Sequence, residues 1–341
     1  MSIMNSRIAL KSALMMGAAA GMMMAAGGAR AQSSGYTYTE ISDPFEVYDT
    51  PAEGINNAGQ IVGYYQNKSS GHVEGFLVNN GTYTNLSDPL GVFGTFSLGV
   101  NNGGQIVGWY FDSSTVRHGF IDTNGTYTTI DDPLAGTAMF QGTVANGING
   151  AGQIAGSYQD SSGVWHGFVD TNGTLTTNNA PLGAKGTQVE GINDAGQIVG
   201  SYADSSGVGH GFIDTSGTYK AINDPLGAKG TSANGINDAG QIVGAYTDTS
   251  GQSHGFLESN DTYMSLNDPL GVNGTWAQGI NNAGDIVGYY ADSSGNNHGF
   301  LATPNGTTTD GAPLPVTGGT LPGAAVLLGW LGRRIAQRRK A

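Results

Sequence analysis

The chain has 341 residues, a formal net charge of −13, 58 glycines and no cysteine. All 26 acidic residues lie between positions 32 and 310 beside five basic ones, so this region carries 5 − 26 = −21. Such a surface repels phosphate backbones and anionic lipid, which argues against nucleic acid as a partner. The lack of cysteine excludes disulfides, thiolate metal sites and cysteine nucleophiles.

Residues 1–31 have the pattern of a secretory signal peptide. Arg7 and Lys11 precede an apolar stretch of Ala, Met and Gly, and Ala29-Arg30-Ala31 forms a small-residue cleavage site. An uncleaved membrane helix is the alternative, against which the glycine content and the cleavage site argue. We therefore expect the chain to be exported.

The region 32–310 is a six-fold repeat. The segment Gly54-Ile55-Asn56-Asn57-Ala58-Gly59-Gln60-Ile61-Val62-Gly63 returns in five later units, whose leading glycines are Gly99, Gly147, Gly191, Gly235 and Gly279. These glycines are 44 to 48 residues apart, a period typical of propeller blades.

Each unit contains four short segments rich in β-branched and aromatic residues. In one unit they are 186–193, 197–202, 210–214 and 218–222, separated by clusters of Gly, Asn, Asp and Ser. Four antiparallel strands in each of six units predict an all-β, six-bladed β-propeller, with a β-solenoid as the alternative. Alternation along the strands places a set of side chains in the core: Ile198, Tyr202, Phe212, Tyr219 and Ile222.

The two ends of the repeat region complement each other. Residues 36–44 match the fourth strand and exit loop of a unit, whereas the sixth unit ends at 305–310 without such a strand. We expect the N-terminal strand to pair into the last blade and close the ring. The predicted organisation is a signal peptide (1–31), a repeat domain (32–310) and a C-terminal sorting segment (311–341).

All six histidines fall within the repeat. Five of them precede Gly-Phe, whereas His72 stands three residues before Gly75, with Glu74 in the usual position. The five are His118, His166, His210, His254 and His298. A set of metal ligands is one interpretation. Equivalent positions of a propeller lie far apart around the ring, so a structural His that bonds a neighbouring Asp or carbonyl explains the regularity better.

Loops of the Asp-Ser-Ser-Gly type follow the second strand of most units. Their acidic residues are Asp112, Asp160, Asp204, Asp248 and Asp292. Carboxylate and hydroxyl oxygens could hold Ca²⁺ there, but the spacing matches neither an EF-hand nor a calcium β-roll. Asp and Ser also cap tight turns, which is the favoured interpretation. No other cofactor is expected.

The residue before each leading glycine lies on the innermost strand, beside the central channel. Five of the six are polar, and Leu98 is the exception; the polar residues are Glu53, Asn146, Glu190, Asn234 and Gln278. Glu53 and Glu190 lie three units apart, on opposite blades, so their carboxyl groups could converge on a cation or a sugar. A water-filled channel without a ligand is the alternative.

The motifs of common hydrolases and phosphate-binding loops are absent from the sequence. A hydrolase or lyase would therefore have to use Glu53 and Glu190, within ~10 Å of each other. Aromatic residues that we expect to be exposed on the blade loops are instead candidates for stacking on glycans: Trp109, Trp165 and Trp276. Six similar faces also suit multivalent binding.

Past Asp310 the composition changes. Pro313-Leu314-Pro315 and a glycine-rich spacer lead to the apolar run 321–332 and a basic end that begins with Arg333 and Arg334. This pattern resembles the PEP-CTERM sorting signal of Gram-negative bacteria, with Pro313-Leu314-Pro315 where the family usually has Pro-Glu-Pro. The resemblance implies recognition by an exosortase, transient membrane insertion and removal of the tail, and delivery to the cell surface, outer membrane or exopolysaccharide matrix. Residues 314–318 also fit the sortase motif of Gram-positive cell walls.

The repeat itself resembles the HAF family of extracellular repeats. Its His-Gly-Phe, Thr-Asn-Gly-Thr-Tyr and Gly-Ile-Asn-x-x-Gly-Gln-Ile-Val-Gly segments carry the resemblance over most of residues 36–309. This resemblance implies an extracellular setting and supplies no activity. We expect an exported, surface-associated, non-enzymatic binding or structural module for which surface polysaccharide is the candidate ligand. A propeller hydrolase or lyase with an axial carboxylate site is the alternative.

Overall fold

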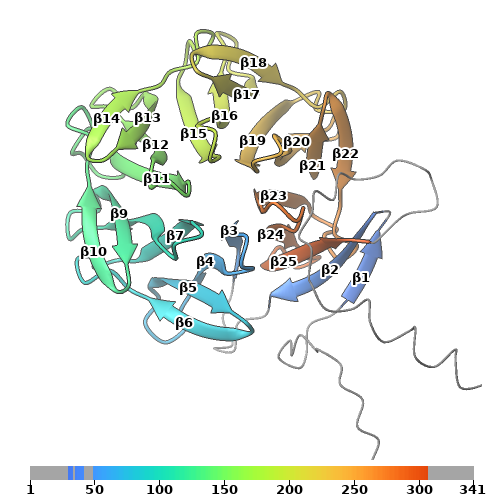
Figure 1. Cartoon of the computed structure of the whole chain (residues 1–341), viewed down its shortest axis with the longest axis horizontal. Helices are drawn as coiled ribbons and strands as arrows, with labels where there is room; N and C mark the ends of the chain where they lie inside the picture. The colour runs from blue at the N-terminus through green and yellow to red at the C-terminus, as the bar shows by residue number, and fades with distance from the viewer. Residues whose placement is uncertain (1–29, 34, 42–48, 306–341) are drawn as a thin grey trace, which may run out of the picture.

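The computed structural model is a ring of antiparallel β-sheets around a central axis (Figure 1). The structure describes residues 30–33, 35–41 and 49–305. Most of the expected signal peptide lies outside these residues, and so does the whole sorting segment, with Pro313, Leu314, Pro315, Arg333 and Arg334. In the part of the chain that the structure describes, no helix is long and apolar enough to cross a bilayer.

The strands follow the predicted four per unit. Blades 1 to 4 contain β3 (Ala52–Ile55), β4 (Ile61–Gln66), β5 (Val73–Asn79), β6 (Thr82–Leu86), β7 (Thr95–Val100), β8 (Ile106–Phe111), β9 (Arg117–Thr123), β10 (Thr126–Ile130), β11 (Gly142–Ile148), β12 (Ile154–Gln159), β13 (Trp165–Thr171), β14 (Thr174–Thr177), β15 (Thr187–Ile192), β16 (Ile198–Ala203), β17 (Gly209–Thr215) and β18 (Thr218–Ile222). Blades 5 and 6 contain β19 (Gly230–Ile236), β20 (Ile242–Thr247), β21 (Ser253–Ser259), β22 (Thr262–Leu266), β23 (Thr275–Ile280), β24 (Ile286–Ala291) and β25 (Asn297–Pro304), together with β1 (Arg30–Ser33) and β2 (Tyr36–Ile41).

The predicted β-propeller is confirmed, with one difference in how its sheets are separated. Within the described residues the strands form five hydrogen-bonded sheets: three of four strands, one of five and one of eight. The eight-stranded sheet consists of two antiparallel sets, β7–β10 and β11–β14, which the parallel pair of Gly142 and Arg117 joins. The six four-stranded units of the sequence are therefore present, but blades 2 and 3 are not separate sheets.

The ring is closed by the N-terminal strand, as predicted. Strand β2 pairs antiparallel with β25, from Tyr36 opposite Pro304 to Ile41 opposite Gly299. Tyr36 and Tyr38 are each 1% exposed, so this strand contributes to the core and does more than cover an edge. Strand β1 extends the same sheet beyond β2, and its first two residues, Arg30 and Ala31, lie inside the expected signal peptide.

The core lies between neighbouring blades. Ile198, Tyr202, Phe212 and Ile222 are buried and Tyr219 is partly buried, which confirms the predicted alternation. The Phe of each unit packs over a glycine of the second strand; a Cβ on Gly200 would lie 2.0 Å from the Gln188 carbonyl oxygen and 3.0 Å from the Phe212 ring. Only glycine permits this close approach of strand and ring.

Candidate functional site

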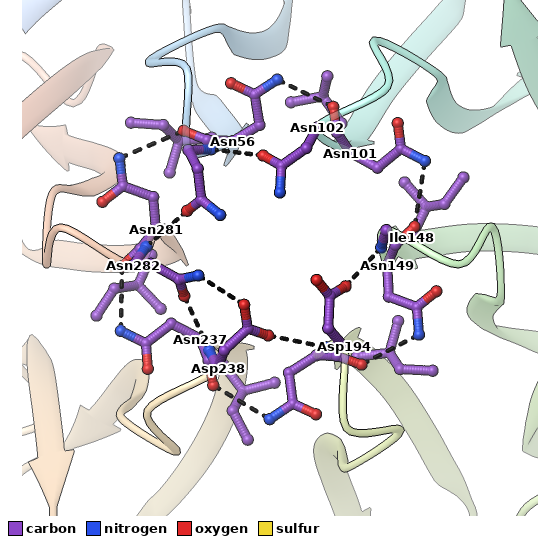
Figure 2. A pocket seen from close by; sticks show the side chains of 18 residues that line it. Asn56, Asn101, Asn102, Ile148, Asn149, Asp194, Asn237, Asp238, Asn281 and Asn282 are labelled. Carbon is purple, nitrogen blue, oxygen red and sulfur yellow. Dashed lines mark hydrogen bonds between the residues drawn. The ribbon is translucent and has the colours of Figure 1, made fainter. Parts of the chain in front are cut away.

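A ring of six buried asparagines surrounds one mouth of the central channel (Figure 2). The asparagine ring consists of Asn56, Asn101, Asn149, Asn193, Asn237 and Asn281. The Nδ2 atom of each donates to the main-chain carbonyl of the next member at 2.9–3.3 Å, and the last donates to Asn56, so the ring is closed. These hydrogen bonds tie every blade to both of its neighbours.

Each ring asparagine also shapes its own loop. The Oδ1 atom of Asn193 accepts hydrogen bonds from the main-chain N–H groups of Ala195 and Gln197, and its Nδ2 atom donates to the Gln197 side chain at 2.8 Å. Asn193 is 3% exposed, so these polar atoms are satisfied within the protein. The sequence predicted Asn193 only as the end of a strand segment and the start of a turn, although its return in every unit was the available signal for a further role.

A second set of hydrogen bonds, nearer the axis than the first in Figure 2, runs around the ring and is interrupted once. The residue after each ring asparagine donates its main-chain N–H to the side chain of its counterpart in the next blade, as Asp194 does to Asp238 at 2.9 Å. The counterpart of Asn102 is Gly150, which has no side chain to accept this bond. Both sets border a cavity of about 100 Å³ at the mouth of the channel.

The predicted axial residues are partly connected to one another. Asn234 donates to the Oε1 atom of Gln278 at 2.5 Å, and Gln278 donates to the Oε2 atom of Glu53 at 2.7 Å. Asn146 instead donates to the main-chain carbonyl of Val189 at 2.6 Å. Blades 5, 6 and 1 therefore share a continuous chain of side-chain hydrogen bonds around the axis.

The pKa values of the two axial carboxyl groups are raised, which favours their neutral form. Burial raises the pKa of Glu53 to about 7, against which hydrogen bonds from Gln278 and Tyr64 act. Burial raises the pKa of Glu190 to about 8, and repulsion from Glu53 adds to the effect. Both shifts arise because a charged carboxylate loses its hydration in the interior. A protonated carboxyl group can donate as well as accept a hydrogen bond.

Two tyrosines interact with Glu53, and each contacts a further aromatic ring. Tyr64 bonds Glu53 and contacts Phe96 edge-on at 5.0 Å, while Trp276 stacks on Tyr289 with ring centroids 5.0 Å apart. Burial raises the pKa of Tyr289, and repulsion from Glu53 adds a smaller increase. Tyr289 and its stacking partner Trp276 therefore lie near the same carboxyl group as Tyr64. We call Glu53, Gln278, Asn234, Trp276 and Tyr289 the axial site.

The expectation of exposed tryptophans is wrong. Trp109, Trp165 and Trp276 are all half-buried. Trp109 stacks on Phe96 at 3.9 Å, and the Arg117 guanidinium lies 5.4 Å from the Trp109 ring and 5.6 Å from the Trp165 ring. The aromatic and cationic side chains of blades 2 and 3 thus cover one another, because parallel pairing brings β9 and β11 together.

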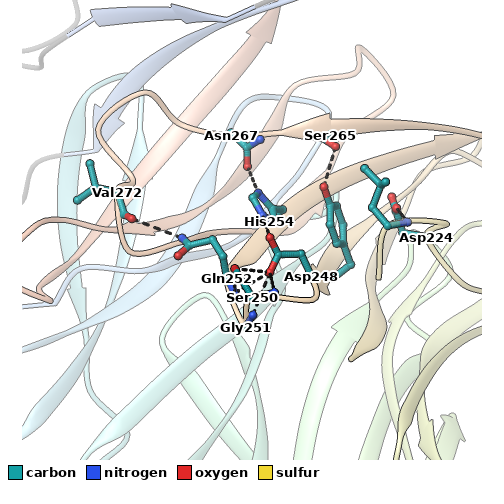
Figure 3. A network of polar contacts seen from close by, with 11 residues as sticks. Asp224, Asp248, Ser250, Gly251, Gln252, His254, Ser265, Asn267 and Val272 are labelled. Atoms are coloured by element: carbon teal, nitrogen blue, oxygen red, sulfur yellow. Dashed lines mark hydrogen bonds and ion pairs between the residues drawn. The ribbon is translucent and has the colours of Figure 1, made fainter. Parts of the chain in front are cut away.

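The histidines belong to a repeated polar network near the loops after the second strands (Figure 3). In blade 5, His254 Nε2 lies 3.3 Å from Asp248 Oδ2, His254 Nδ1 lies 2.9 Å from Asn267, and the imidazole stacks on Tyr246. Equivalent Asp–His pairs are Asp112–His118, Asp160–His166, Asp204–His210 and Asp292–His298. This geometry supports the structural interpretation of the histidines.

The loop carboxylates are already occupied by their own loops. Asp248 Oδ1 accepts hydrogen bonds from the Ser250 hydroxyl, the Ser250 main-chain N–H and the Gln252 main-chain N–H. These bonds, of which the one from the Ser250 hydroxyl has the largest effect, hold the pKa of Asp248 well below its usual range. Among the described residues, no group of three or more His, Asp or Glu side chains is placed to hold a metal ion. Calcium binding by these loops stays a prediction.

Blade 1 builds the same network with reversed polarity. Glu74 takes the place of the histidine and accepts from Asn67, Asn85 and the Tyr65 hydroxyl at 2.7–2.9 Å. Asn67 stands where the other blades have aspartate. In blade 1 the carboxylate is therefore on the third strand, at Glu74, and the amide is in the loop, at Asn67. The exchange conserves the hydrogen bonds and removes the need for an ionisable histidine at this position.

Comparison with known proteins supports the fold alone. No protein-family model matches the chain, and no curated protein sequence matches it. AofleA from Arthrobotrys oligospora has a similar structure, with 12% identity and a TM-score of 0.50 over 83% of this chain and 89% of that one. A fucose-recognising lectin of Aleuria aurantia, described as a six-bladed β-propeller, is similar at 13% identity and a TM-score of 0.47 over 78% of this chain and 100% of that one. The sialidase of Trypanosoma rangeli is similar at 10% identity and a TM-score of 0.45 over 82% of this chain and 60% of that one. At 12% identity, the likeness to AofleA is one of β-propeller architecture.

Proposed function

We propose that this chain is an exported, surface-associated module that binds glycans at the axial site and does not turn them over. The observation that carries the proposal is the chain of hydrogen bonds from Asn234 through Gln278 to Glu53, beside the stacked pair of Trp276 and Tyr289. Ligand sites commonly combine apolar or aromatic surface with a few convergent polar groups. A sugar ring matches both, since it has apolar C–H faces and hydroxyl groups at its edge.

The protonation of the site favours a neutral ligand. The region 32–310 carries −21, yet the pKa values of Glu53 and Glu190 are about 7 and about 8, so much of the local charge is absent near neutral pH. Neutral carboxyl and amide groups can donate to and accept from sugar hydroxyls without a compensating cation. This chemistry supports polysaccharide over a metal ion or a charged ligand.

The alternative function is a hydrolase or lyase that uses Glu53 and Glu190. Acid–base catalysis on a glycoside usually needs one protonated and one ionised carboxyl group, with pKa values pushed apart by their surroundings. Here burial raises the pKa of both groups. Because both pKa values are raised rather than pushed apart, the pair lacks the arrangement that acid–base catalysis needs, which favours binding over turnover. Release of reducing sugar from a polysaccharide panel, lost in E53Q and in E190Q, would establish the alternative.

Glycan binding is tested with the full chain on an array of bacterial surface polysaccharides and small glycosides. The array includes α-methyl-L-fucoside, which a lectin of Aleuria aurantia binds. We expect saturable binding that falls at least ~10-fold in W276A and Q278A, the loss of about 1.4 kcal/mol. W165A is the matched control, because Trp165 belongs to blade 3 and contacts Arg117, whereas Glu53 belongs to blade 1. Equal losses in W276A and W165A would argue against the axial site.

Two further parts of the proposal need separate tests. Export and surface delivery are tested by fractionating cells that express the chain with or without residues 1–31 and 311–341. We expect the first deletion to keep the protein inside the cell and the second to release it from the surface. Calcium dependence is tested by repeating the binding assay with Ca²⁺ and with a chelator. Sensitivity to the chelator that D204N and D248N abolish would assign the metal to the loops.

A further inference from the structure

A second cavity lies between blades 3 and 4, away from the axial site. It has a volume of about 290 Å³ and is lined by strands β13 and β14 of one blade and by the start of β16 and the β17–β18 turn of the next. Its lining includes Val169, Thr176 and Asn178 on blade 3 and Ile198 and Asp214 on blade 4. Its volume lies just below the range of about 300–1,000 Å³ that is typical of small-molecule sites.

The cavity exists because blade 3 departs from the repeat at its fourth strand. Asn178 pairs with Gly167, a position where the other blades place a buried aliphatic residue opposite the equivalent glycine. Those residues are Ile41, Leu86, Ile130, Ile222 and Leu266, each at most 8% exposed. On the neighbouring strand, Val169 replaces the longer Ile or Leu of other blades, such as Ile213. Smaller side chains at these two positions occupy less of the interface between blades 3 and 4 than their counterparts would.

A second comparison concerns the strand position of Thr176. Thr176 pairs with Val169, and the equivalent residue of blade 5 is Met264, which pairs with Leu257 and packs into the core between blades 5 and 6. The fold therefore accommodates a long apolar side chain at this position. Blades 1 and 2 also have threonine here, at Thr84 and Thr128, and in blade 3 Thr176 lines the cavity.

The polar groups of the cavity are fixed in place. Asn178 donates to Asp214 Oδ2 at 2.9 Å and accepts from the Tyr219 hydroxyl at 2.8 Å. Asp214 is 4% exposed, and its other oxygen accepts the Gly217 N–H at 2.7 Å. The hydroxyl groups of Thr171 and Ser216 stand at the rim. Each carboxylate oxygen keeps capacity for a further hydrogen bond.

We propose that this cavity binds one small polyhydroxylated molecule, such as a single pyranose unit. Val169 and Ile198 offer apolar surface to the C–H face of a ring, while Asp214, Asn178 and the hydroxyl groups offer acceptors and donors to a diol. Among the residues that line the cavity there is no cationic side chain, which disfavours an anion. The proposal extends the ligand class of the proposed function to a second site and does not require the axial site to bind.

The experiment uses saturation-transfer NMR and titration of the full chain with the methyl glycosides of glucose, galactose, mannose and fucose. T176M fills the cavity with the side chain that blade 5 uses, and N178I restores the aliphatic residue of the repeat. Both variants are expected to weaken glycoside binding at this site at least ~10-fold. The matched control is T128M, since Thr128 pairs with Ile121 as Thr176 pairs with Val169. T128M is expected to leave binding unchanged.

The outcomes separate this proposal from the axial one. W276A and Q278A test the axial site, whereas T176M and N178I test the cavity, so loss of either site leaves the other measurable. Because N178I removes a cavity and a partly buried amide, its melting temperature shows whether it has folded; T176M gives the same test independently. Unchanged binding in T176M and N178I would overturn the proposal, as would the absence of any signal from all four glycosides in the wild-type chain.

Discussion

The raised pKa of Glu190 makes the stability of the protein depend on pH in a definite direction. In the folded protein the pKa is about 8, compared with 4.5 for the unperturbed group. The folded state therefore binds the proton more tightly than the unfolded state. Stability from this group is complete below pH 4.5, decreases as pH rises, and is lost above about pH 8.

The size of the effect follows from the same two values. A tenfold change in proton affinity is about 1.4 kcal/mol, so a rise from 4.5 to about 8 corresponds to roughly 5 kcal/mol between the two limits. Typical domains unfold with 5–15 kcal/mol, so ionising Glu190 removes a substantial part. Glutamine keeps the shape of the side chain and has no charge. E190Q should match the wild type near pH 5 and exceed its stability by several kcal/mol at pH 9.

The assay is guanidinium unfolding followed by tryptophan fluorescence at pH 5, 7 and 9. Glu53 supplies an internal check, because its repulsion contributes to the raised pKa of Glu190. In E53Q the pKa of Glu190 should fall, and the loss of stability attributable to Glu190 should become smaller. A constant difference between wild type and E190Q across the three pH values would refute the reasoning, since it would mean that Glu190 titrates alike in both states.

Three further predictions concern the closure of the ring. N193A removes four hydrogen bonds from a 3% exposed position and should cost about 3 kcal/mol, a fall in Tm of roughly 6–12 °C by calorimetry; a fall below about 2 °C would contradict the interlocking role. G150N supplies the acceptor that the Asn102 N–H lacks in the second set of hydrogen bonds, at the cost of a small shift of the Asp194 carboxylate, and should stabilise the fold by about 0.5–1.5 kcal/mol; a lower midpoint in urea would refute it. Deleting residues 1–41 removes β2 with the buried Tyr36 and Tyr38 and should cost at least ~4 kcal/mol, with faster proteolysis at β25; unchanged protection would show that β2 does not close the ring.

Local patterns were sufficient to predict the strands and the turns. The alternation of apolar residues identified the buried Phe212 and Ile222, and the Asn-Gly pairs of the hairpins take the positive φ that such turns need, 54° at both Asn124 and Asn172. The missing fourth strand of the last unit, together with the spare strand at residues 36–41, predicted the closure. These features depend on residues close in sequence or on counting repeats.

The sites depend on residues that only the closed ring brings together. Asn193 bonds Asn237, 44 residues away, and Asn281 bonds Asn56 across the two ends of the repeat, so no single unit contains the information. The axial chain was predicted as a set of positions, but its hydrogen bonds and the raised pKa of Glu53 and Glu190 follow from burial, which is a property of the assembled ring.

The tryptophans and the second cavity also depend on contacts that the local sequence pattern does not contain. Trp109 was expected to be exposed because it lies near a loop, yet Arg117 of β9, which pairs with β11, lies over the rings of both Trp109 and Trp165. Asn178 is an ordinary polar residue in the sequence, and it borders a cavity because it stands at a position of blade 3 where the other blades have a larger aliphatic side chain. The sequence by itself determined the repeat, its strands and its closing strand, since these follow from local periodicity. Tertiary structure alone decided which side chains meet between blades and which carboxyl groups lose their hydration, because both depend on packing between distant units.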